Sequence, residues 1–577
     1  MRFTVSLLHA ACLGVLGPAL AAQDYTSTAP SPASATSQSL PLKHAPAPTK
    51  PAITAADLMT RLYIYADDSM MGRQAGSEYN LKSTAYIEGQ VRKLGLVPAG
   101  DAGGYFQAVP LVKQVFDSSA PIAVGDVNLV AWTDFLPRDQ GSKMRPVDGV
   151  AAVYAGVWGD STMLTADQGA GKLVVIGVRT GNQPNGLPAW QISRFAVTNR
   201  YRSAAGIAVV SMDYMSPGFI GQFRSPFPTL KGAGGGDTLA LPSYIYITSA
   251  VAKRLFGVPL DSAKAGATGA ALKGNIRFVE VAAPARNVVA ILPGSDPKLK
   301  NEYVAIGAHN DHIGFDNTPL DHDSLRAFNT AAMHLRDNLA PNTPPNPQLF
   351  AGIHVNVDSL HAAHPARRDS IFNGADDDGS GTASVLEIAE QFATTRAHPK
   401  RSILFVWHTG EELGLFGSQW FTDHPTVPRD SIVAQLNMDM VGRGDSADTK
   451  GGGPTYLMLI GSRRLSTELG DIVESVNRQE KRPFTFDYSW DANGHPENVY
   501  CRSDHYEYAR YGIPITFFTT GLHQDYHQLT DEPQYIDYEH MARVAQLVHD
   551  VAVAVANLDH RVVVDKPKPD LNAPCRQ

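Results

Sequence analysis

Six continuous apolar runs between residues 287 and 521 constrain the fold of this chain most strongly. Runs that do not alternate between polar and apolar residues are typical of strands buried on both faces of a sheet. Helical patterns separate most of them, including those of 379–393 and 539–558. The pattern predicts an α/β fold in which helices flank a mixed, mostly parallel sheet. The runs are NVVAILPG (287–294), EYVAIGAH (302–309), SILFVWHTG (402–410), SIVAQLNMD (431–439), TYLMLIGS (455–462) and PITFFTTG (514–521).

Residues 116–282 have a different character. Short β-rich runs such as VAAVYAGVW (150–158) and KLVVIGV (172–178) alternate there with loops rich in Gly and Pro. This spacing predicts a compact β-rich domain. Because a helical pattern precedes it, we expect it to be inserted into a larger domain formed by 53–115 and 283–560.

The N-terminal segment 1–22 has the pattern of a secretory signal peptide. A basic residue is followed by a short apolar stretch and by an Ala-Leu-Ala cleavage site. Residues 23–52, rich in Pro, Ala and Ser, are expected to be a flexible linker, and 561–577 a loose tail. The chain is therefore expected to be exported, to the periplasm or outside the cell.

Composition excludes several classes of protein. The formal net charge of −8, without a long basic run, argues against nucleic acid as a partner. After signal cleavage no apolar stretch reaches the roughly 20 residues of a membrane span. Three Cys in 577 residues rule out a disulfide scaffold. Cleavage leaves Cys501 and Cys575, whose pairing the sequence does not settle.

Polar residues collect where the predicted strands end. In open α/β sheets, ligands bind outside the carboxyl ends of the strands, so these side chains are expected to converge. Imidazole and carboxylate ligands without Cys favour a divalent ion such as zinc. The carboxylates outnumber the ligands that one tetrahedral ion needs, which favours a site for two ions. The residues are His309, Asp311, Asp376, Asp377, Asp378, Glu411, Glu412, Asp439 and His527.

Six motifs in order resemble the M28 family of co-catalytic zinc aminopeptidases. The segment 116–282 is similar to the protease-associated domain that many members carry. The resemblance implies the fold of the zinc-dependent exopeptidases, peptide substrates and two zinc ions per chain. The motifs are GAHNDHIG (307–314), NGADDDGSGT (373–382), GEELGLFGS (410–418), LNMDMVGR (436–443), YCRSDH (500–505) and YHQLTDE (526–532).

The resemblance also implies a role for each site residue. His309 and Asp439 would bind one zinc ion, Glu412 and His527 would bind the other, and Asp377 would bridge the two. Glu411 would be the general base, and Tyr500 would assist in stabilising the oxyanion. Asp311 would hydrogen-bond the imidazole of His309 and fix its tautomer.

Other polar residues of the motifs are expected to play supporting parts. Asp378 or Ser380 is predicted to cap the helix that follows the triple aspartate. His312 and His408 are expected to be structural or to support the ligands rather than to bind metal. The chain departs from compact members of the family in a long insertion, 313–372, between the first two ligands. We expect this insertion to form a lid or a wall of the substrate pocket.

Several alternative functions stay open at this point. The same fold includes carboxypeptidases and glutaminyl cyclases, and a cyclase-like site would hold one zinc ion. A carboxypeptidase needs a cation for the terminal carboxylate of its substrate, which Arg443 or Arg502 would provide. A non-catalytic binding module is a further alternative. The leading hypothesis is an exported aminopeptidase that acts on peptides.

Overall fold

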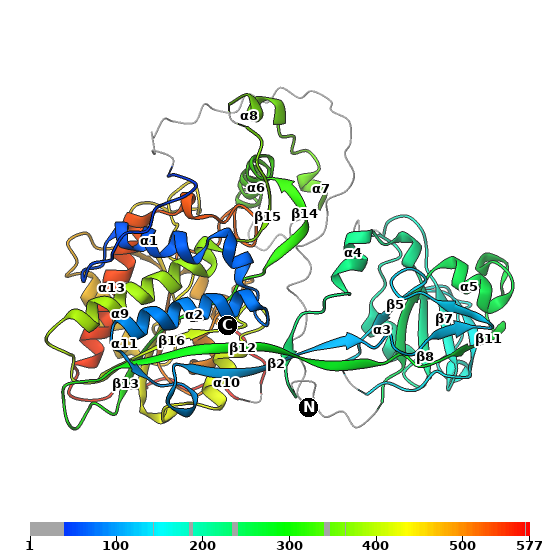
Figure 1. Ribbon diagram of the computed structural model, residues 1–577, viewed down its shortest axis with the longest axis horizontal. Coiled ribbons are helices and arrows are strands. Elements are labelled where there is room, and N and C mark those ends of the chain that lie inside the picture. The colour runs from blue at the N-terminus through cyan, green and yellow to red at the C-terminus, as the bar shows by residue number, and fades with distance from the viewer. Residues whose placement is uncertain are drawn as a thin grey trace. The chain divides into compact units, whose positions relative to one another are not determined.

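The computed structural model (Figure 1) describes residues 40–141, 143–183, 188–232, 240–339, 347–363, 365–571 and 573–577. Within them the chain divides into two compact units. The first unit comprises 40–110 and 283–577, and the second unit comprises 111–282. The predicted signal peptide, 1–22, lies outside the described residues, as does the linker up to residue 39.

A mixed sheet forms the centre of the first unit and confirms the predicted α/β fold. Its strand order is β19-β18-β20-β17-β13-β16-β12-β2, with β1 paired to β12. The four central strands β20, β17, β13 and β16 are parallel. The strands are β1 (Val97–Pro98), β2 (Phe106–Phe116), β12 (Phe278–Leu292), β13 (Tyr303–His309), β16 (Ser402–His408), β17 (Ile432–Met438), β18 (Tyr456–Ile460), β19 (Thr485–Asp487) and β20 (Ile515–Thr519).

Helices cover both faces of this sheet. Helices α1, α9 and α13 pack against one another, and α9 and α13 also contact β13 (Figure 1). On the other face, α12 contacts β17 and β20. The core divides accordingly, because Val304 and Ile306 of β13 belong to one apolar cluster and Ala305 to the other. The helices are α1 (Ala55–Tyr65), α2 (Glu78–Lys93), α9 (Gly381–Thr394), α10 (Phe416–Asp423), α11 (Thr467–Asn477), α12 (His505–Ala509) and α13 (Tyr538–Ala556).

The second unit has its own sheet, in the order β4-β3-β11-β6-β7-β8-β10-β5. Strands β6, β7, β8 and β10 are parallel. Strand β9 (Thr229–Leu230) pairs with Leu111 and Val112 in the middle of β2. The other elements are β3 (Ile122–Val124), β4 (Val127–Leu129), β5 (Phe135–Arg138), β6 (Val150–Val157), β7 (Leu173–Gly177), α3 (Arg194–Arg200), β8 (Gly206–Val210), α4 (Pro217–Gln222), β10 (Ser243–Ile247), α5 (Ser249–Phe256) and β11 (Thr268–Lys273).

The insertion, residues 313–372, has secondary structure of its own. Strands β14 and β15 pair antiparallel, and in the described part of the insertion three helices lie between them in the sequence. The elements are β14 (Phe315–Asp321), α6 (His322–Asp337), α7 (Pro347–Phe350), α8 (Val357–Ala363) and β15 (Arg368–Ile371).

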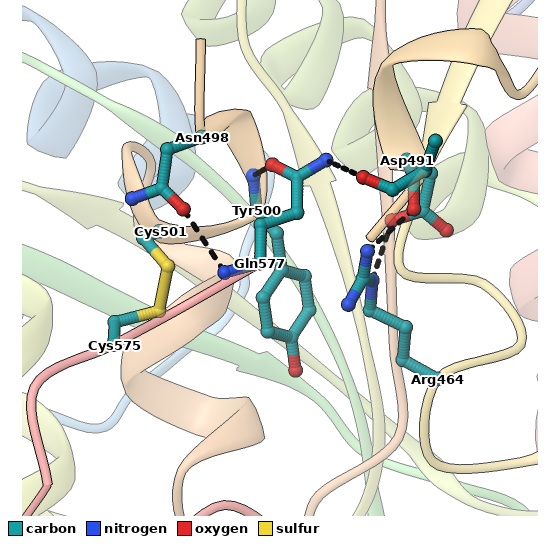
Figure 2. The surroundings of a disulfide bond; sticks show 8 residues. Arg464, Asp491, Asn498, Tyr500, Cys501, Cys575 and Gln577 are labelled. Atoms are coloured by element: carbon teal, nitrogen blue, oxygen red, sulfur yellow. Dashed lines mark hydrogen bonds and ion pairs between the residues drawn. A yellow bond between two sulfur atoms is a disulfide. The ribbon is translucent and has the colours of Figure 1, made fainter. Parts of the chain in front are cut away.

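Two expectations about the chain's flanking segments need correction. Leu40, in the segment predicted to be a flexible linker, packs against the core, and the Tyr63 hydroxyl donates to the carbonyl of Pro41. The expected loose tail is fastened, because Cys575 forms a disulfide with Cys501 (Figure 2). Both segments gain contacts that local composition does not reveal. None of the helices in the described residues is long and apolar enough to span a membrane.

Gln577 adds hydrogen bonds beside this disulfide, one through its side chain and one through its backbone. Its Oε1 accepts the backbone N–H of Tyr500 at 3.0 Å, and its backbone N–H donates to Oδ1 of Asn498 at 3.0 Å (Figure 2). The segment 573–577 therefore holds the loop that precedes Ser503 and α12.

Candidate metal centre

The carboxyl ends of the parallel strands bring the predicted ligands together. His309 ends β13, Glu411 and Glu412 follow β16, and Asp439 follows β17 directly. His527 lies in the loop after β20. Because these strands are neighbours and run in the same direction, the segments after them meet at one edge of the sheet. The ligand cluster consists of His309, Asp377, Glu412, Asp439 and His527.

Asp377 lies between the two imidazoles of the ligand cluster. Its Oδ1 is 3.1 Å from Nε2 of His309, and its Oδ2 is 3.1 Å from Nε2 of His527. Oδ1 of Asp439 is 3.6 Å from the same nitrogen of His309. Oε2 of Glu412 is 2.9 Å from the same nitrogen of His527. The two oxygens of Asp377 thus face two separate sets of predicted ligands.

The backbone around Asp377 is held from two sides. Its N–H and that of Asp376 donate to the carboxylate of Asp531, each at 3.0 Å. Arg73 donates to the carbonyl of Gly374 at 2.9 Å. Gly374 has φ of 55°, and a Cβ there would lie 2.3 Å from the carbonyl oxygen of Asp377. Only glycine therefore fits this turn. The peptide bond between Asp377 and Asp378 is cis.

The donor set fits zinc. Nε2 of His309 and Oδ2 of Asp377 are buried and have no hydrogen-bond partner among the described residues. Buried polar atoms normally have a partner, and a metal ion is a partner that fits both of these atoms. Two groups have ligand atoms within 4.8 Å of one another: His309 with Asp377 and Asp439, and His312 with Asp377 and Glu412. Imidazole and carboxylate without thiolate suit zinc or a similar divalent ion.

Burial and charge shift the pKa values of the site strongly. Burial raises the pKa of Glu411 well above its usual range, and Asp439 and Glu412 raise it further. Burial would also raise the pKa of Asp377, but the imidazoles of His309 and His527 hold it well below its usual range. The two acids, each within 4.0 Å of Nε2 of His309, thus have pKa values shifted in opposite directions.

Asp378 and Ser503 support the ligands. Oδ1 of Asp378 accepts the N–H of Gly381 at 2.8 Å, at the start of α9, and its Oδ2 accepts the N–H of His309 at 3.0 Å. The hydroxyl of Ser503 donates to Oδ2 of Asp439 at 2.7 Å. The expected capping role thus falls to Asp378. Ser503 stands in the motif YCRSDH but was not assigned a role from the sequence.

Asp311 differs from the expectation in the atom that it uses. Nδ1 of His309 lies 3.1 Å from the backbone carbonyl of Asp311 and 3.8 Å from its Oδ1. Oδ1 of Asp311 instead accepts the N–H of Glu411 at 3.2 Å. The carbonyl fixes the tautomer of the imidazole, and the carboxylate positions Glu411.

The structure does not bring Tyr500 into contact with the ligand cluster. Its ring packs against His505. The guanidinium of Arg464 (Figure 2) lies 4.6 Å from the centroid of the same ring. Tyr526 is closer, because its ring stacks on His527 at 4.0 Å between centroids. Its Oη accepts from Nη2 of Arg502 at 3.3 Å. The sequence analysis missed Tyr526, although it directly precedes the ligand His527.

The insertion is anchored beside the same site. Nε2 of His322 is 2.8 Å from Oε2 of Glu532, and Arg367 pairs with both oxygens of this carboxylate. Glu532 belongs to the loop that also carries His527. The ring of His322 stacks on Tyr535, with 6.0 Å between centroids. The insertion is thus tied by charge to the loop that supplies a predicted ligand.

Known proteins resemble the first unit. Residues 287–552 match the profile of peptidase family M28. Leucine aminopeptidase 1 of Paracoccidioides brasiliensis (strain Pb18) is 30% identical over 195 residues, which cover 31% of this chain and 47% of the relative. Leupeptin-inactivating enzyme 1 of Streptomyces exfoliatus is 35% identical over 105 residues, or 18% of this chain and 21% of the relative. This chain thus spans about half the length, or less, of these curated relatives.

Solved structures give a weaker likeness. An aminopeptidase from Aneurinibacillus sp. strain AM-1 is 16% identical, with a TM-score of 0.45. The alignment covers 90% of this chain and 98% of that chain.

Proposed function

Because residues 287–552 belong to peptidase family M28, we propose that this protein is an exported metallo-exopeptidase that removes N-terminal residues from peptides. The observation that carries the proposal is the position of Asp377, whose two oxygens each lie 3.1 Å from a different imidazole. This arrangement supports a site for two zinc ions. His309 and Asp439 would hold one ion, Glu412 and His527 would hold the other, and Asp377 would contribute one oxygen to each.

Zinc, when bound, supplies the Lewis acidity that polarises a peptide carbonyl and makes water a stronger acid. The protein must then move the proton. Glu411 is the proposed general base, because its Oε2 lies 4.0 Å from Nε2 of His309, where a carboxylate can accept a proton and pass it to the leaving amine. The amide N–H of Glu411, bound to Asp311, fixes the start of this side chain.

An aminopeptidase must also recognise a free amine. Carboxylates outnumber imidazoles among the residues of this site, which favours a substrate whose terminal group is a positively charged amine. Tyr500 was proposed to stabilise the oxyanion, and its contacts favour a packing role. Tyr526, stacked on His527 and bonded to Arg502, is better placed for that task.

One of the two arginines considered for a carboxypeptidase cannot bind the terminal carboxylate of a substrate. Arg443 is buried, and its Nη atoms lie 3.0 Å from Asp448 and 3.0 Å from Asp525, so it is not free to bind a substrate. Arg502 is the remaining candidate, and it pairs with Glu497 at 3.0 Å. A glutaminyl cyclase would need one zinc ion, whereas the ligand cluster has donors for two.

Export is part of the proposal. The disulfide between Cys501 and Cys575 supports it, since disulfides persist in oxidising compartments. We also propose that the second unit, 111–282, is a protease-associated domain.

Metal analysis combined with a panel of peptides tests the function. We expect two zinc ions per chain and hydrolysis of peptides with a free N-terminus, but not of the same peptides with an acetylated amine. Peptides amidated at the C-terminus should be cleaved as well as free ones. Loss of activity on amidated peptides would indicate a carboxypeptidase, and one ion per chain would favour a cyclase.

A further inference from the structure

His312 is a fully buried histidine whose ring is fixed beside the ligand cluster. It lies in the loop after β13, which Gly72 holds by accepting the N–H of Gly314 at 3.0 Å. A Cβ on Gly374 would come within 2.6 Å of the His312 ring. The ring therefore packs directly on the turn that presents Asp377, and it has little freedom to change its orientation.

One nitrogen of this ring faces a predicted metal ligand. Nδ1 of His312 is 2.7 Å from Oε1 of Glu412. The other oxygen of the same carboxylate, Oε2, is 2.9 Å from Nε2 of His527. The two rings stand at 68° to each other, 5.7 Å apart between centroids. Two imidazoles thus approach the two different oxygens of Glu412.

The distances separate the roles of the two histidines. Nε2 of His527 lies within 3.1 Å of both Asp377 and Glu412, as expected of atoms that share one ion. Nδ1 of His312 is 3.9 Å from Oδ2 of Asp377, so it makes a short contact with Glu412 alone. A single short N···O contact to one carboxylate oxygen is the geometry of a hydrogen bond.

We propose that His312 is a positioning residue for the second metal ion. It donates its Nδ1–H to Oε1 of Glu412 and thereby directs Oε2 toward the site that His527 and Asp377 share. A glutamate ligand has three rotatable bonds, and a hydrogen bond to its free oxygen selects one arrangement before the ion arrives. The inference rests on the proposed two-metal function and concerns the assembly of that site.

Metal binding by the full-length protein tests this role without reference to turnover. Wild type, His312→Ala and His312→Asn are stripped with a chelator and titrated with Zn²⁺ and Co²⁺. The asparagine amide places an N–H donor near the position of Nδ1, but it is a poor ligand for zinc. His540→Asn, at a buried histidine that bonds the carbonyl of Tyr456, is the control.

We expect His312→Ala to weaken the second, lower-affinity ion by about 10- to 100-fold, the usual cost of losing a group that orients a ligand. The first ion should be retained, because His309 and Asp439 keep their contacts. His312→Asn should restore the second affinity to within about threefold and give the cobalt absorption spectrum of wild type, since the number of coordinating nitrogens is unchanged.

Two results would overturn the proposal. An asparagine variant as weak as the alanine variant, with an altered cobalt spectrum, would make His312 a ligand. An alanine variant with wild-type affinity would leave His312 no role at the metal. If His312→Ala does not fold, as judged by circular dichroism, the zinc affinity and the cobalt spectrum of His312→Asn still distinguish a positioning residue from a ligand. Failure of wild type to cleave peptides would refute the proposed function separately.

Discussion

The backbone N–H of Asp377 donates to Oδ2 of Asp531 at 3.0 Å. This bond joins the loop of Asp377, the proposed bridging carboxylate, to the loop that carries His527. The proposed two-metal site therefore depends on a residue that is not itself a ligand. Its neighbour Glu532 anchors the insertion, so the same short segment supports both the ligands and the insertion.

Replacing Asp531 tests this dependence. Asp531→Ala leaves the N–H groups of Asp376 and Asp377 without their acceptor, so we expect zinc affinity to fall by about 10- to 100-fold at both positions. Asp531→Asn keeps one oxygen acceptor and should lose less. Isothermal titration with zinc measures the difference. Equal and full zinc affinity in both variants would contradict the support role.

Replacing Glu411 separates catalysis from metal binding. Glu411→Gln keeps the shape of the side chain but cannot take up a proton, so we expect kcat to fall by about 10²- to 10⁴-fold. Metal analysis should still find the zinc content of wild type. Glu280→Gln, at an exposed glutamate in the second unit, is the matched control. Near wild-type turnover in Glu411→Gln would refute the general-base role.

The anchor of the insertion should depend on pH. Burial lowers the pKa of His322, but the contact with Glu532 raises it by more than burial lowers it. The pKa in the folded state therefore lies above the ordinary value of 6.5. The pairing of His322 with Glu532 is therefore fully present below pH 6.5, as long as Glu532 is ionised. It is lost as pH rises through the folded pKa of His322.

The carboxylate of Glu532 titrates at the acidic end. Burial would raise its pKa, but Arg367 and His322 lower it to about 2. The contribution of this carboxylate to stability is therefore present above pH 4.5 and is lost as pH falls toward 2.

Hydrogen exchange in β14, β15 and α6 measures this effect. A hydrogen bond to a charged partner contributes about 1.5 kcal/mol, so protection should fall roughly tenfold from pH 6 to pH 9 after correction for intrinsic exchange. In His322→Gln, which cannot be charged, the protection of these elements should no longer vary over that range. A variant that keeps the full pH dependence of wild type would assign the effect to another group.

The disulfide should contribute substantially to stability. Cys501 and Cys575 are 74 positions apart, and closing a loop of that length stabilises the folded state by about 4 kcal/mol in the chain-entropy model. Cys501→Ser with Cys575→Ser should therefore lower the denaturation midpoint by several degrees. Differential scanning calorimetry of the double variant and of wild type makes the comparison. An unchanged midpoint would show that the hydrogen bonds of Gln577 suffice to hold the tail.

The positions of the central strands, and the convergence of the predicted ligands at their ends, could be predicted from the sequence because both depend on local patterns. A buried strand is a continuous apolar run, and a polar residue at its carboxyl end must lie at the edge of the sheet. This reasoning placed His309 and Asp439 at one edge, where the structure has them. Asp377 precedes a helix rather than following a strand, and its place among the ligands came from the resemblance.

Contacts between distant segments could not be predicted in the same way. The hydrogen bond from Asp377 to Asp531 joins residues 154 positions apart. No local sequence pattern around either residue predicts that it contacts the other. The pairing of Arg367 with Glu532 spans 165 positions. Asp311 was misassigned because a residue type does not tell whether the carboxylate or the carbonyl will face a ring. Such choices depend on the turn that the backbone takes.

The chain passes from the first unit into the second along β2 and returns along β12, and these two strands are neighbours in one sheet. Its two points of attachment are therefore close together, and a short turn between the paired strands could replace all of 111–282. The inserted unit can therefore be exchanged or lost while the strands that carry the proposed metal ligands keep their order. Sequence changes within this unit can accumulate through evolution without altering the residues at the sheet edge.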